Sequence, residues 1–92
     1  MTDGQASIST EILARYAGDA AREVEGVRGL AGRRGARVHD DGRVELHLAL
    51  AWGASIPAVG RRVQERVREY LLHMADLEPV AVDVIVDEIG TP

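Results

Sequence analysis

Residues 44–74 read VELHLALAWGASIPAVGRRVQERVREYLLHM, and this stretch decides the fold. Its first part alternates apolar residues with polar or small ones, which predicts a strand with one buried face. The predicted core face consists of Val44, Leu46, Leu48, Leu50 and Trp52. Beyond Gly53 the apolar residues recur every three or four positions, which predicts a helix capped by Ser55 that continues to about His73.

Upstream of this unit, the sequence predicts a first helix from about Thr10 to Glu25. Ser9 is a suitable N-cap, because its hydroxyl can accept a hydrogen bond from a free backbone N–H of the first turn. The apolar residues that follow recur at helical spacing and form a stripe that would face the core. Gly26 is expected to end this helix, since the residue just past a helix often needs a positive φ.

The Asp-Asp-Gly sequence at residues 40–42 favours a tight hairpin turn. This turn would pair residues 36–39 antiparallel with residues 43–52. A Val-rich last strand follows Pro79, and a strand–helix–strand connection within one sheet should run parallel and right-handed. The predicted fold is α-β-β-α-β, a single small α+β domain whose three-stranded mixed sheet carries two helices on one face.

The chain length of 92 residues fits one hydrophobic core. We expect residues 8–89 to form this folded domain, with a disordered N-terminus at 1–7 and a disordered C-terminus at 90–92. No apolar run approaches the roughly 20 residues that span a bilayer, and the N-terminus does not resemble a secretory signal. These features predict a cytoplasmic protein with no direct membrane insertion.

The composition argues against several functional classes. Cysteine is absent, which excludes a disulfide framework, a thiolate nucleophile and a Cys-based metal site. The net charge of −4 opposes a general affinity for nucleic acid or anionic lipid, because such contacts need an excess of cations. Only a local basic patch could overcome that charge.

The sequence indicates no catalytic or metal site. The three histidines, His39, His47 and His73, do not have the spacing of metal ligands. Each serine lies at a predicted helix start, without an evident partner base that could activate it as a nucleophile. We therefore predict a protein that is not an enzyme and has no catalytic residue, metal, cofactor or small-molecule substrate.

One local basic patch lies between Val27 and His39, where glycines recur every third residue. Its candidate anion-binding or nucleic-acid-binding residues are Arg28, Arg33, Arg34 and Arg37. A Gly-x-x-Gly loop that grips phosphates would explain them, although such loops join two helices and this one would join a helix to a strand. A solvated flexible connection explains the same residues and is favoured here.

The face of the sheet that no predicted helix covers is the more informative surface. It would combine charged residues with small and apolar ones, and such a surface is typical of protein interfaces. The candidate interface residues are Glu45, His47, Ala49, Ala51, Ile85 and Ile89. Self-association through this face is the natural hypothesis, because one edge strand of the sheet would also be unprotected.

An ordered set of motifs along the chain resembles the alkaline shock protein (Gls-type) envelope stress response family of bacteria. The resemblance rests on a helix that begins after Ile8, on EVEGVRG at 23–29, on LALAWG at 48–53 and on MADL at 74–77, before a Val-rich strand. It covers nearly the whole chain, to about Ile89. Each motif alone is weak, so the order of the set carries the specificity.

This resemblance implies a small α+β domain that is non-enzymatic and takes part in cell-envelope homeostasis or stress response. It also implies self-association as a homo-oligomer and a membrane-anchored protein partner, which would hold the chain peripheral to the membrane. The family offers no established catalytic or ligand residue to carry over. The alternative from the residues themselves is a nucleic-acid-binding module that uses the loop at 28–37.

Overall fold

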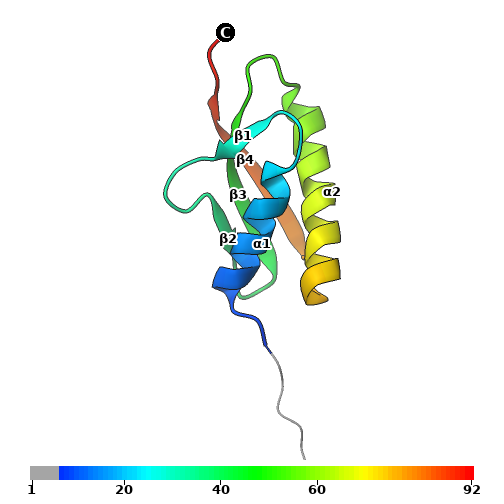
Figure 1. Ribbon diagram of the computed structural model, residues 1–92. Coiled ribbons are helices and arrows are strands. Elements are labelled where there is room, and N and C mark those ends of the chain that lie inside the picture. The colour runs from blue at the N-terminus through cyan, green and yellow to red at the C-terminus, as the bar shows by residue number, and fades with distance from the viewer. Residues whose placement is uncertain (1–6) are drawn as a thin grey trace, which may run out of the picture.

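A computed structural model describes residues 7–92, in which two helices and four strands follow one another (Figure 1). The elements are α1 (Thr10–Arg22), β1 (Val27–Leu30), β2 (Ala36–Val38), β3 (Arg43–Leu50), α2 (Ile56–Ala75) and β4 (Ala81–Ile89). The predicted α+β class is confirmed. The predicted disordered N-terminus lies outside the described residues, apart from Ser7.

Strand β3 is the centre of the sheet. Both β1 and β2 pair with it antiparallel, β1 opposite residues 48–50 and β2 opposite residues 44–46. They therefore lie one after the other along the same edge of β3. Strand β4 runs parallel along the opposite edge, as expected for strands joined by a crossover helix. The sheet is mixed, as predicted, and it contains four strands because one edge is shared by two short ones.

The sequence prediction missed β1, because it assigned the residues after Val27 to a flexible connection. The structure ties this segment to β3 at both of its ends. Ala51 N–H donates to Gly26 O at 2.8 Å, and Ala31 N–H donates to His47 O at 2.8 Å. The strand is short and its register shifts between Val27 and Gly29. It therefore lacks the alternation by which a strand is recognised in a sequence.

Both helices pack on one face of the sheet, as predicted, and the core lies between the two layers. The side chains of β3 that point into it are Val44, Leu46, Leu48 and Leu50, all at most 1% exposed. Helix α2 contributes Val59, Val63, Val67 and Leu71, and α1 contributes Ala17, Ala20 and Ala21. Small residues on α1 let it approach the sheet closely. Neither described helix combines the length and apolar character that a membrane span requires.

The caps of both helices agree with the sequence. Ser9 accepts from Ile12 N–H at 3.2 Å and Ser55 accepts from Ala58 N–H at 3.4 Å. Helix α1 nevertheless ends at Arg22, three residues earlier than expected. The chain then turns through Gly26, whose φ of 99° is the left-handed value predicted for it.

Trp52 is the one member of the predicted core face of β3 that lies outside the core. Its side chain is 62% exposed. The strand ends at Leu50, and the chain then turns, with Ala54 N–H donating to Ala51 O at 3.2 Å. Alternation therefore stops two residues before the tryptophan, and the predicted strand end at residue 52 is wrong.

The turn between β1 and β2 leads to a prediction about Gly35. A Cβ there would lie 2.5 Å from Leu30 Cβ and 2.9 Å from Ala31 O, whereas a Cβ on Gly29 would have no neighbour within 4 Å. We expect Gly35→Ala to lower the free energy of unfolding by about 1–3 kcal/mol, because backbone atoms must move to admit the methyl group. Gly29→Ala should change it by less than about 1 kcal/mol. Urea unfolding measures both, and equal effects would contradict this packing.

Candidate protein interface on the outer sheet face

The outer face is the side of the sheet opposite the two helices. Along β3, buried residues alternate with partly exposed ones, and Glu45, His47 and Ala49 are the partly exposed set. Ile85 on β4 is in register with His47 and is also partly exposed. Both described helices lie on the other side of the sheet (Figure 1). Glu45, His47, Ala49 and Ile85 therefore share one uncovered surface, which we call the outer face.

Charged side chains on the outer face form a line of pairwise contacts. The His47 ring lies between two carboxylates, with Nε2 2.7 Å from Glu45 Oε2 and Nδ1 2.7 Å from Asp87 Oδ2. The other oxygen of Glu45, Oε1, lies 3.1 Å from His39 Nε2. The line thus joins the β2–β3 hairpin, β3 and β4 across the sheet.

These contacts shift the pKa values of two groups. Hydrogen bonds to Glu45 and then to Asp87 raise the pKa of His47, because both carboxylates favour the charged ring. Hydrogen bonds from His47 and then from His39 lower the pKa of Glu45. A doubly protonated ring can donate from both nitrogens, so His47 and its two carboxylate partners form a charged network that fixes the side chains of the outer face.

One predicted interface residue, Ile89, does not lie on the outer face. The register of β3 and β4 shifts between Leu48 and Ala49, so that Val86 pairs with Leu48 and Glu88 pairs with Ala49. Asp87 is the extra residue of this bulge. Ile89 therefore pairs with Leu50, whose side chain points into the core, and lies on the helix side of the sheet. The expectation that Ile89 shares a face with Ile85 is wrong for this reason.

Two members of the charged line were not among the predicted interface residues. Alternation along the last strand indicates the correct face for Asp87, but its contact with His47 depends on the register of β3 and β4. His39 comes from the hairpin and reaches Glu45 because β2 and β3 pair there. Ala51, a predicted member, lies just beyond the end of β3 and donates its backbone N–H to Gly26.

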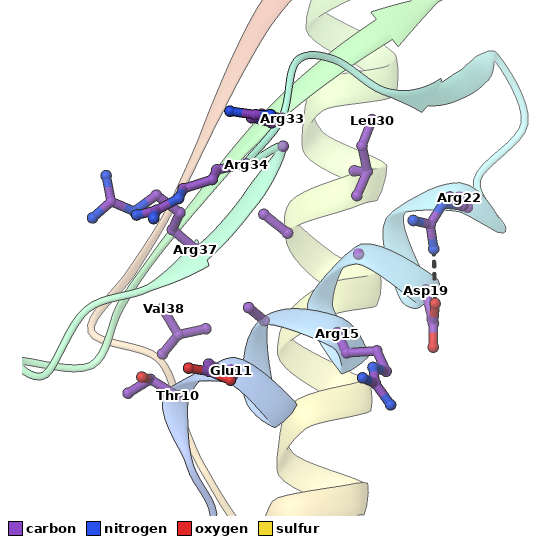
Figure 2. Close-up of a pocket in the computed structure, with 14 residues that line it drawn as sticks. Thr10, Glu11, Arg15, Asp19, Arg22, Leu30, Arg33, Arg34, Arg37 and Val38 are labelled. Atoms are coloured by element: carbon purple, nitrogen blue, oxygen red, sulfur yellow. Dashed lines mark hydrogen bonds and ion pairs between the residues drawn. The ribbon is translucent and has the colours of Figure 1, made fainter.

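The four arginines of the predicted basic patch do not form one group. Arg33, Arg34 and Arg37 line a groove of about 560 Å³ between α1 and β2, which we call the α1–β2 groove (Figure 2). Arg28 instead lines a smaller hollow of about 420 Å³ beside Gly90 and Thr91. Any binding by the patch would therefore use the three arginines of the α1–β2 groove without Arg28.

The charged line on the outer face is not arranged as a metal site. Each histidine in it contacts carboxylate oxygens through its ring nitrogens. The four side chains are linked one after another, and they do not converge on a common point where an ion could bind. In the described part of the chain, no three His, Asp or Glu side chains are grouped so that they could hold a metal ion.

Comparison with known proteins places this architecture in a family. Residues 34–91 match the alkaline shock protein 23 family, whose description is a cell envelope-related function. The uncharacterized protein YqhY of Bacillus subtilis (strain 168) is 33% identical over an alignment 92 residues long. This alignment covers 80% of this chain and 68% of YqhY. The chain therefore belongs to the alkaline shock protein 23 family, and the resemblance seen in its motifs is confirmed.

The fold is also similar to solved structures of MamM-CTD. One variant of that protein has a TM-score of 0.58 at 18% identity, covering 90% of this chain and 100% of the other. A manganese form of another variant has a TM-score of 0.55 at 18% identity, covering 87% and 99%. At this level of identity the similarity concerns the fold alone.

The charged line predicts how stability depends on pH. The folded pKa of His47 lies above its ordinary value of 6.5, so its contribution is fully present below pH 6.5 and is lost as the pH rises through the folded pKa. The folded pKa of Glu45 lies below 4.5, so its contribution is present above pH 4.5 and is lost as the pH falls through the folded pKa. The network should therefore stabilise the fold most between pH 4.5 and pH 6.5.

We expect His47→Gln to lower the free energy of unfolding more at about pH 5.5 than at about pH 9, because only the charged ring holds both carboxylates. Denaturant unfolding of both proteins at the two pH values measures this difference. His73→Gln is the control, since exposed His73 has no ion-pair partner among residues 7–92. Its effect should depend less on pH. An effect of His47→Gln that is equal at both pH values would contradict the charged network.

Proposed function

We propose that this chain is a non-enzymatic protein-interaction module of the cell envelope, which self-associates through the outer face and binds a membrane-anchored partner. The family supplies the cell envelope-related function. The observation that carries the proposal is the outer face itself. It combines partly exposed Ile85 and Ala49 with a fixed line of charged groups, on a side of the sheet that neither described helix covers.

The composition of the outer face suits contact with a second copy of the same chain. A two-fold interface brings the same patch together from both subunits, so the patch must be complementary to itself. The outer face carries both signs of charge, with His47 between Glu45 and Asp87. Two such lines can be placed so that each cation faces a carboxylate of the other, around an apolar centre at Ile85.

The network also reduces the energetic cost of forming an interface. Contacts within the sheet already hold the side chains of Glu45 and His47, so these groups lose little conformational freedom when a partner binds. Their charges are also paired before contact, which lowers the cost of removing water from them. The same arguments support binding of a partner protein that carries a similar domain.

Substitution of Ile85 tests self-association. We expect wild-type protein to have a mass above the monomer value of 9.9 kDa, and Ile85→Glu to shift it to the monomer, because contact would remove water from a carboxylate at the apolar centre of the interface. Val80→Glu is the matched control, since Val80 is 74% exposed and lies outside the outer face. Size-exclusion chromatography with light scattering measures all three. A monomer in every case would contradict self-association.

Capture from cell fractions tests the membrane-anchored partner. Immobilised wild-type chain should recover a membrane protein from the membrane fraction, and Ile85→Glu should recover much less of it if the partner also docks on the outer face. Val80→Glu should behave as the wild type does. Recovery of ribosomes or RNA in place of a membrane protein would contradict this assignment.

A further inference from the structure

The α1–β2 groove lies at the free edge of β2, beside the outer face, and it joins an unpaired strand edge to a concentration of positive charge. We propose that this groove binds an acidic, extended peptide segment of a partner protein, which adds to the free edge of β2 as a further strand. This binding site does not depend on self-association through the outer face.

The free edge of β2 follows from its hydrogen bonds with β3. Gly35 O accepts from His47 N–H at 2.7 Å, and His39 N–H donates to Arg43 O at 2.8 Å. Backbone groups of successive residues point to opposite sides of a strand, so residues 35, 37 and 39 face β3. The N–H and C=O groups of Ala36 and Val38 therefore point away from β3. No other described strand pairs with β2, so these four groups can bind an added strand.

The groove beside this edge is shaped by small residues. A Cβ on Gly18 would lie 3.0 Å from Leu30 Cδ1 and 3.5 Å from Ala36 Cβ, so the helix backbone approaches β2 closely at this point. Ala14 lines the groove one turn earlier on α1. An added strand would have alternate side chains directed toward α1, and small or medium apolar side chains fit above these residues.

The charge of the groove selects for an acidic partner. Among residues 7–92, five arginines line it, together with two acidic residues, Glu11 and Asp19. Asp19 already accepts from Arg22 Nη1 at 2.7 Å. The whole chain has a net charge of −4, so this concentration of arginine is local. A peptide with acidic residues at every second position would direct them toward the arginines while its other side chains face α1.

The arginines on β2 and the preceding turn lie close to where the acidic side chains of such a peptide would be. Arg33, Arg34 and Arg37 extend from β2 and the preceding turn and point away from α1, as Figure 2 shows. None of these three forms an ion pair within residues 7–92. Single-stranded RNA is the competing ligand for this charge. Its recognition relies on aromatic side chains that stack on bases, and no aromatic residue of the described chain lines the groove. The open strand edge favours a peptide.

The binding experiment uses fluorescence anisotropy with a labelled peptide of about nine residues that alternates Glu and Val. We expect it to bind the wild-type chain, and we expect binding to weaken with added salt. A Lys–Val peptide should not bind. A Glu–Val peptide with methylated backbone nitrogens should bind much more weakly, because it cannot pair with β2.

Charge reversal locates the site. Arg34→Glu combined with Arg37→Glu should weaken binding at least about tenfold. The control combines Arg61→Glu with Arg62→Glu, which makes the same charge change on the exposed side of α2 and should alter binding by less than about twofold. Ile85→Glu should leave peptide binding unchanged, which separates this proposal from self-association.

Amide hydrogen exchange tests strand addition directly. Peptide binding should slow exchange at Ala36 and Val38, whose N–H groups are free, and should leave Arg37 nearly unchanged, since its N–H already pairs with β3. Three results would overturn the proposal: no binding of the acidic peptide, equal loss in both double variants, or no added protection at Ala36 and Val38. Tight binding of single-stranded RNA that the peptide cannot displace would also overturn it.

Discussion

The alternation of β3 is the constraint on which the rest of the structure depends. This strand is paired along both edges, and every side chain that it directs toward the helices is almost fully buried. A shift of one residue would place the leucines in water and Glu45 and His47 in the core. Burying one such aliphatic side chain contributes about 1.5–3 kcal/mol. The register of β3 is therefore strongly fixed, and it positions β1, β2, β4 and both helices.

The same constraint shapes the surface that is available for binding. Because β3 uses its backbone groups on both edges, it can contact a partner only through the side chains of the outer face. Strand β2 is different, because it pairs with β3 alone among the described strands and keeps one edge open. The two proposed sites thus use different chemistry, with side chains on the outer face and backbone groups in the α1–β2 groove.

Much of this fold can be predicted from the sequence, because the core obeys local patterns. The alternation from Val44, the helical spacing after Ser55 and the hairpin turn at residues 40–42 each depend on neighbouring residues only. Strand β1 could not be found in this way. Its four residues include a bulge and show no alternation of apolar and polar side chains, and the strand forms through pairing with the distant β3. The early end of α1 and the exposure of Trp52 likewise depend on where the chain turns.

The candidate interface was predicted only in part, for a related reason. Alternation places Glu45 and His47 on one face from the sequence alone. The contacts of His47 with Asp87 and of Glu45 with His39 depend on strand registers, and the bulge at Asp87 moves Ile89 to the helix side. The groove lined by Arg33, Arg34 and Arg37 depends on how α1 lies against β2, which no local pattern reveals.

The outer face as the surface of self-association is the central claim, and concentration-dependent amide chemical shifts test it most directly. ¹H–¹⁵N spectra recorded over a range of protein concentrations should show shifts that centre on His47, Ala49 and Ile85. The exposed side of α2 should remain unchanged. Shifts that centre on α2, or spectra that do not change with concentration, would contradict the claim.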